Sequence, residues 1–129
     1  MNETKPIFIN LSNHPSTGWS EEQLTAAQGI GDIVDMAFPP VSPEMTTDQV
    51  KEKADELVAA ILEHGEPATL TVHIMGEMTL TYSVVVVLCR LGVRCVASTT
   101  ERIVTEVDGK KVSEFHFVQF REYANVKQF

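Results

Sequence analysis

Short apolar runs with the length of β-strands alternate along the chain with segments of helical periodicity. The predicted strands cover residues 6–11, 32–38, 68–75 and 93–98, and the predicted helices cover residues 21–29, 47–64 and 80–91. Strand–helix alternation is typical of a parallel sheet, because the chain must cross back over the sheet before the next parallel strand begins. The sequence therefore predicts an α/β fold.

The segment 80–91 carries an ambiguous pattern. Its four consecutive valines, residues 84–87, are typical of a strand. The segment is long for a strand, Gly92 can end a helix, and a crossover is needed before the next parallel strand, so we expect a helix. In a helix these apolar residues encircle the axis, and the face turned away from the sheet would lie in water. We therefore expect a homodimer, in which a second copy covers that face.

Two strand-like runs, residues 101–107 and 111–121, flank the strongest local signal. The dipeptide Asp108-Gly109 between them tolerates the positive backbone angles of a type I′ turn, so the sequence predicts a β-hairpin. Regular alternation in the second run would place Phe115 and Phe117 on one face, and Val118 and Phe120 on the other.

Right-handed crossovers predict the sheet order 2-1-3-4, extended by the C-terminal hairpin. This arrangement is a Rossmann-like three-layer sandwich with a mainly parallel sheet, and residues 1–129 form one domain. The chain winds outward in opposite directions from strands one and three, which leaves a crevice at their carboxyl ends. The loops at residues 12–19 and 76–79 are therefore expected to build a ligand pocket.

The composition excludes several classes of protein. The apolar and charged fractions, 43% and 22%, are those of ordinary globular chains rather than disordered or fibrous ones. The net charge of −8 opposes binding to duplex nucleic acid or to an anionic membrane, because such binding rests on a broad basic surface. A small anion can still bind to backbone amides and a few basic groups inside one cleft.

A cytoplasmic location is expected from features that the sequence lacks. No apolar run approaches the roughly 18 residues of a membrane span, and residues 1–6 lack the basic start and long apolar stretch of an export signal. Cys89 and Cys95 lie in apolar surroundings without ligand-like spacing, so we expect two buried thiols rather than a disulfide or a metal site.

The loop after the first strand carries three candidate ligand-binding residues. His14 can donate to a phosphate or act as a general acid, and it can equally be a loop histidine that hydrogen-bonds to neighbouring backbone. Ser12 and Asn13 can present a hydroxyl and an amide to a nucleotide, or they can simply form the turn.

The loop after the third strand supplies Gly76, Glu77, Met78 and Thr79 as further candidates. Gly76 permits close backbone approach, and Thr79 can cap the next helix while the helix amides meet an anion. Glu77 would repel a phosphate if it pointed inward, but it can accept a hydrogen bond from a ribose hydroxyl or a base. The alternative is a tight turn with a helix cap.

The fourth strand ends in a cluster of hydroxyls, a carboxylate and a guanidinium. The candidates here are Thr99, Thr100, Glu101 and Arg102, preceded by Ser98. A guanidinium can bind phosphate oxygens through a planar pair of donors, although a turn followed by a surface Glu–Arg pair would give the same pattern.

Two residues after the hairpin are further candidates for the pocket, and one histidine lies inside a predicted strand. Arg121 and Tyr123 follow the hairpin and either line the cleft or close the domain. His73 lies inside the third strand and is expected to be a core residue with its hydrogen bonds satisfied.

The stretches 73–82, 97–102 and 117–123 resemble the small stand-alone CARF-type proteins that accompany type III CRISPR systems. The opening strand with Asn13-His14 and the helix containing Gln23 also fit, so the resemblance spans most of the chain. It implies a homodimer that binds a cyclic oligoadenylate, expected to be cyclic tetra-adenylate, across the two-fold axis. Several such proteins are ring nucleases that linearise this antiviral messenger, and similar ones sequester it without efficient cleavage.

By this resemblance, residues 13–14, 76–79 and 99–102 are ligand-site residues, with His14 and Arg102 in catalytic roles. The expected chemistry is attack by a ribose 2′-hydroxyl on the adjacent phosphodiester, which requires no metal or cofactor. Arg102 and amides near Gly76 would stabilise charge on phosphate oxygens, and His14 would protonate the leaving oxygen. The rival hypotheses are a non-catalytic sponge or sensor, and a Rossmann-like interaction subunit without a nucleotide.

Overall fold

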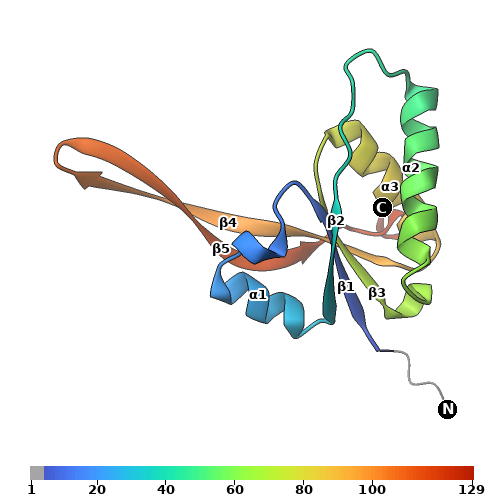
Figure 1. Ribbon diagram of the computed structural model, residues 1–129, viewed down its shortest axis with the longest axis horizontal. Helices are drawn as coiled ribbons and strands as arrows, with labels where there is room; N and C mark the ends of the chain where they lie inside the picture. Colours follow the sequence, from blue (N-terminus) through green and yellow to red (C-terminus); the bar gives the residue numbers. More distant parts are fainter. Residues whose placement is uncertain (1–4) are drawn as a thin grey trace.

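The computed structural model describes residues 5–129 and contains a five-stranded sheet of order β2-β1-β3-β4-β5 (Figure 1). The strands are β1 (Ile7–Ser12), β2 (Asp32–Ala37), β3 (Leu70–Met75), β4 (Arg94–Val107) and β5 (Lys110–Glu122), and the helices are α1 (Glu21–Gln28), α2 (Thr47–Leu62) and α3 (Met78–Arg90). The first four strands are parallel, and β5 is antiparallel to β4. The predicted Rossmann-like fold and its strand order are confirmed. Residues 1–6 were expected to lack an export signal, and the first four of them lie outside the described residues.

The two faces of the sheet carry cores of different size. The larger core lies under α2 and α3, where Ile9 and Leu11 of β1 and Val72 and Ile74 of β3 are buried. The smaller core lies under the shorter helix α1 on the opposite face. It contains Phe8, Ala27 and Val96, with Trp19, Ile30, Ile33 and Phe120 packed against them.

The valine-rich segment is a helix, as expected, but its exposed stripe differs from the predicted one. Val84 is fully buried, and the other three valines of residues 84–87 are half-buried because α2 packs beside α3. Met78 and Tyr82 are instead 83% and 72% exposed. Together with Val86 they recur every four residues, which places them on one side of the helix.

β4 is one continuous strand, although the sequence pattern indicated two segments, residues 93–98 and 101–107. It pairs with β3 only over residues 94–96 and then continues with β5 as a two-stranded ribbon that projects far from the helices (Figure 1). No turn interrupts the two segments because residues 99 and 100 both stay in the ladder with β5. The hairpin itself is confirmed, with φ angles of 52° at Asp108 and 77° at Gly109.

A β-bulge in the hairpin changes which aromatic side chains share a face. Thr99 pairs with Gln119 but Thr100 pairs with Phe117, so Val118 is an extra residue in β5. The rings of Phe117 and Phe120 consequently meet, with centroids 4.9 Å apart. The expectation that Phe120 lies on the face opposite Phe117 is therefore wrong.

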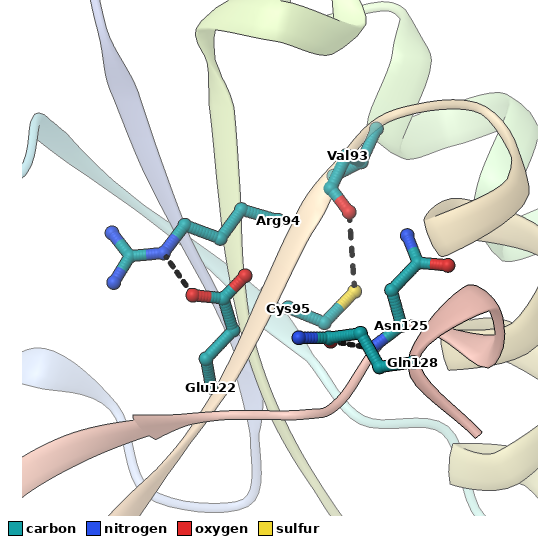
Figure 2. Close-up of polar contacts among 6 residues, drawn as sticks. All are labelled: Val93, Arg94, Cys95, Glu122, Asn125 and Gln128. Carbon is teal, nitrogen blue, oxygen red and sulfur yellow. Dashed lines mark hydrogen bonds and ion pairs between the residues drawn. The ribbon is translucent and has the colours of Figure 1, made fainter.

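An ion pair joins β4 to β5 at the base of the hairpin (Figure 2). Nε of Arg94 lies 3.2 Å from a carboxylate oxygen of Glu122. The Tyr123 hydroxyl donates to the carbonyl of Ile74 at 2.9 Å, so this residue closes the domain.

Cys95, whose Sγ lies 4.0 Å from the carbonyl of Val93, is a free buried thiol like Cys89, as expected. Within residues 5–129, none of the helices combines the length and the apolarity that a membrane crossing requires.

The turn at Asp108-Gly109 yields a test of the hairpin. Gly109→Ala places a side chain at a positive φ and is expected to weaken the ribbon by about 1 kcal/mol. Hydrogen exchange should speed up for amides of β4 and β5 beyond Thr100, while amides of β1 and β3 keep their protection. Lys110→Ala, outside the two turn positions, serves as the control. Unchanged exchange in Gly109→Ala would contradict the turn geometry.

Candidate functional site

A cavity of about 760 Å³ lies at the carboxyl ends of β1 and β3 and beside the middle of β4, on the face of the sheet that carries α1. It lies where the loop 12–19 was predicted to meet the loop 76–79. Its polar lining consists of Ser12, Asn13, His14, Ser20, Gln23, Ser98 and Thr100, and its aromatic lining consists of Trp19, His73, Phe115 and Phe117. Gly18, Met75 and Gly76 complete the wall.

The buried amide of Asn10 organises the floor of this cavity. Its Nδ2 donates to the carbonyl of His14 and to Oδ1 of Asp35, both at 2.9 Å. Its Oδ1 accepts from the Ser12 hydroxyl at 2.8 Å and lies 2.9 Å from Nδ1 of His73. One side chain thus joins β1, β2, β3 and the first loop.

The carboxylate of Asp35 fixes the start of the 3-10 turn at Ser16–Gly18. Ser16 donates to it through its backbone N–H at 3.1 Å and through its hydroxyl at 2.7 Å. Partial burial raises the pKa of Asp35, but the hydrogen bonds from Ser16 and Asn10 outweigh this effect and leave the pKa below its usual value. The loop is therefore ordered around a charged carboxylate.

His14 contributes to the loop through its backbone rather than its ring. Its carbonyl accepts hydrogen bonds from Asn10 and from Nε1 of Trp19 at 3.1 Å, and its N–H donates to the Ser12 hydroxyl at 3.2 Å. The imidazole is exposed and lines the cavity. Ser12, Asn13 and His14 are therefore brought together as expected, with the His14 ring available to a ligand.

His73 is a core residue, but its hydrogen bonding is incomplete. It is only 2% exposed and stacks on Phe8, with Trp19 and Phe120 edge-on at centroid distances of 5.3 and 5.4 Å. Burial lowers the pKa of His73 to about 4, with a smaller contribution from His14. Within the described chain Nε2 has no hydrogen-bond partner, so the expectation of a satisfied core histidine is wrong for this atom.

Glu77, rather than Thr79, caps helix α3. Its carboxylate accepts from the amides of Thr79 and Leu80 at 3.1 and 2.8 Å, and from the Thr79 hydroxyl. The Thr79 hydroxyl, followed by the amides of Leu80 and Thr79, lowers the pKa of Glu77. A carboxylate is favoured at the positive end of a helix, so these amides already hold the chain's own anion. The expected anion site at the start of α3 is therefore occupied.

Of residues 76–79, only Gly76 lines the larger cavity, and Met78 and Thr79 are the first two residues of α3. A Cβ at position 76 would lie only 2.4 Å from the ring of Phe38. This close approach explains why position 76 requires a residue without a side chain. Met78 and Thr79 instead line a separate cavity of about 570 Å³ between α2 and α3. The structure does not bring these two candidates to the larger cavity.

Strand register separates the candidates on the hairpin. Thr100 lines the larger cavity, and Arg102 follows two residues later on the same face, opposite Phe115. The Arg102 guanidinium donates to the Ser113 hydroxyl at 3.0 and 3.3 Å, so it is held across the hairpin and away from the cavity wall.

The other hairpin candidates lie on the opposite face of the ribbon. Thr99 and Glu101 alternate with Thr100, and Arg121 pairs with Ala97 one position from Ser98. The Thr99 hydroxyl donates to the carbonyl of Gln119 at 3.2 Å. Thr99, Glu101 and Arg121 are thus not brought to the cavity. No three His, Cys, Asp or Glu side chains within residues 5–129 gather as a metal ion would require.

Sequence reasoning missed the aromatic part of the site. Trp19 entered the prediction only as the last residue of the polar loop 12–19. A single tryptophan in a loop that is expected to bind a ligand is a signal that could have identified it as a candidate. Phe115 and Phe117 were recognised as neighbours on one face, but nothing local indicates which face meets the cavity. Ser98 was noted only as part of the hydroxyl cluster.

Comparison with known proteins yields one family. The model of the uncharacterized protein MJ1673 family matches residues 6–121, which include every strand and helix except the last residue of β5. No curated protein matches the sequence significantly.

The depressed pKa of His73 predicts how stability depends on pH. The His73 ring resists protonation in the folded state until about pH 4, whereas in the unfolded chain it binds the proton near its usual pKa of 6.5. Stability from this residue is therefore present above pH 6.5 and lost as the pH falls toward 4, to a total of about 3 kcal/mol. Denaturant titrations between pH 4 and 7 should show this loss in the parent protein and not in His73→Phe. His64→Phe, at an exposed position, is the control, and parallel pH dependences of the parent and His73→Phe would refute the assignment.

Proposed function

We propose that this chain, which belongs to the uncharacterized protein MJ1673 family, is a CARF-type protein that binds a cyclic oligoadenylate in the larger cavity. Cyclic tetra-adenylate is the ring we expect, bound across a homodimer. The observation that carries the proposal is the composition of the cavity wall, where aromatic rings and uncharged polar groups converge at the carboxyl ends of β1 and β3.

Both the position and the lining of the cavity support a nucleotide ligand. In doubly wound folds, ligands bind outside the carboxyl ends of the strands where the chain reverses its winding, which here is between β1 and β3. Trp19, Phe115 and Phe117 offer rings on which a base can stack, while Asn13 and Thr100 offer hydrogen bonds to sugar and phosphate.

The size of the cavity supports a site shared by two copies. Its volume of about 760 Å³ falls in the range of roughly 300–1,000 Å³ that accommodates one small ligand. A ring of four nucleotides is larger than one such ligand, so each copy would hold part of the ring. A two-fold axis presents the same cavity twice, which suits a ligand that is itself symmetric.

The exposed stripe on α3 supports the position of the two-fold axis. Met78, Tyr82 and Val86 form an apolar stripe, and Glu77, the N-cap of the helix, follows Gly76 at the cavity wall. Pairing of two such stripes would remove apolar surface from water and, because the helix starts at this edge of the cavity, bring the Gly76 edges of the two cavities together.

Cleavage of the ring is the second part of the proposal. The substrate supplies its own nucleophile, a ribose 2′-hydroxyl, so the protein must hold ribose and phosphate in line. The His14 imidazole, exposed at the cavity, would protonate the leaving oxygen. Arg102 would stabilise charge on the phosphate only after leaving Ser113.

One observation favours a second candidate function. The cavity wall, within residues 5–129, contains neither lysine nor arginine. Stabilisation of a developing phosphate charge therefore falls to hydroxyls and amides unless Arg102 moves. A protein that sequesters the ring without cleaving it needs no such stabilisation, so the sponge or sensor is the alternative.

The role of His14 can be tested with cyclic tetra-adenylate and the purified protein. Chromatography of the products should show a linear oligoadenylate, and His14→Ala should slow single-turnover cleavage by about 10²–10⁴-fold with a smaller effect on affinity. His64→Ala, on the exposed residue after α2, is the control. Binding without cleavage in the parent would favour the sponge, and absence of binding would refute the proposal in favour of an interaction subunit.

The dimer can be tested on α3. Tyr82→Glu places a charge in the apolar stripe and should convert a dimer into a monomer at micromolar concentration, as measured by light scattering. Affinity for cyclic tetra-adenylate should fall together with dimerisation, and Val86→Glu should act in the same direction. Gln28→Glu, exposed on α1 across the sheet, should change neither property. A monomeric parent protein would rule out the shared site.

A further inference from the structure

The ring of His73 lies at the floor of the larger cavity with one nitrogen committed and the other unpaired. Nδ1 contacts Oδ1 of Asn10 at 2.9 Å, and Nε2 is buried with no partner within residues 5–129. Burying a polar atom without a hydrogen bond is unfavourable, and native structures rarely leave one so. A hydrogen bond from a ligand group would therefore stabilise this unpaired nitrogen in the lining of the cavity.

The contacts of Asn10 determine the chemical character of that nitrogen. Its Nδ2 faces a carbonyl and a carboxylate, which only accept hydrogen bonds, so the opposite amide atom is the oxygen. The oxygen accepts, so Nδ1 of His73 carries the proton and donates to it. Nε2 is then unprotonated and acts only as an acceptor. The pKa of about 4 keeps the ring in this neutral form at ordinary pH.

We propose that Nε2 of His73 accepts a hydrogen bond from the exocyclic amino group of an adenine base, and that it selects 6-amino over 6-oxo purines. This inference rests on the proposed binding of a cyclic oligoadenylate. The N6 amino group of adenine is a donor, whereas the oxygen at the same position of hypoxanthine or guanine is an acceptor. That oxygen and Nε2 of His73 would face each other as two acceptors, with no hydrogen to form a bond between them.

His73 is suited to this choice because its role is fixed. The hydroxyls of Ser98 and Thr100 rotate to donate or to accept, and the exposed amide of Asn13 can turn over. These groups can satisfy either kind of base. His73 cannot exchange its roles, since the Asn10 contact sets the tautomer and the rings of Phe8 and Phe120 hold the imidazole plane.

Access to Nε2 requires one side chain to move, and Trp19 is the best placed to do so. Phe8 is fully buried, whereas Trp19 is half-buried, follows the 3-10 turn at Ser16–Gly18 and lines the cavity. If its ring turns away, the carbonyl of His14 still accepts from Nδ2 of Asn10. Trp19 is also the single tryptophan of the chain, so its fluorescence reports this movement.

The experiment compares cyclic tetra-adenylate with cyclic tetra-inosinate, in which an oxo group replaces each amino group. Affinities for both are measured by calorimetry and by titration of Trp19 fluorescence, on the parent and on His73→Phe. The parent should bind the adenylate roughly 10–100-fold more tightly. His73→Phe keeps a ring in the aromatic enclosure and leaves Oδ1 of Asn10 bonded to Ser12, so it should fold and lose the preference. His64→Phe should retain it.

A spectroscopic measurement on the parent protein does not depend on any variant folding. The ¹⁵N resonance of His73 Nε2 should be that of an unprotonated nitrogen in the free protein and should shift on addition of cyclic tetra-adenylate but not of cyclic tetra-inosinate. Binding of neither ring overturns the proposed function and this inference with it. Equal affinity for the two rings, a preference that survives in His73→Phe, or a free protein protonated at Nε2 overturns this inference alone.

Discussion

The hydrogen bonds of one buried amide, that of Asn10, determine the geometry of the cavity floor. They join β1 to Asp35 on β2, to His73 on β3 and to the backbone of the first loop. Loss of a partner leaves a buried polar group unpaired at a cost of about 1–3 kcal/mol, so the partners stay in place together. Asp35 extends this order to Ser16, and the loop that carries His14 and Trp19 is thereby held against the sheet.

The proposed recognition of a nucleotide in this cavity rests on shape, stacking and uncharged hydrogen bonds. The chain is strongly acidic, the amides at the start of α3 are held by Glu77, and the guanidinium of Arg102 is bonded to Ser113. The residues that remain at the wall are aromatic rings, hydroxyls and amides, which distinguish ligands by the faces and edges of their bases. Under the proposed function, the base is therefore the part of the nucleotide that this wall would contact most specifically.

The sequence predicts the layers of the fold because apolar periodicity is a local property. It identified α3 despite the run of residues 84–87, and it located the cavity because strand order alone determines where the chain reverses its winding. The details of the site depend on partners distant in the sequence. His73 meets Asn10 across 63 positions, and the extra residue Val118 is defined only by pairing with β4. Neither contact has a local signature, so the half-paired imidazole and the position of Phe120 could not be predicted.

The continuity of β4 has a mechanical consequence. Ser98 and Thr100 at the cavity wall belong to the same strand that runs without a break to the tip of the hairpin at Asp108. Beyond residues 94–96, where it pairs with β3, this strand pairs with β5 alone, so the ribbon is a lever whose fixed end adjoins the cavity. A torque applied at the tip reaches the wall of the cavity through covalent backbone and crosses the bulge at Val118, where the β4–β5 ladder is interrupted.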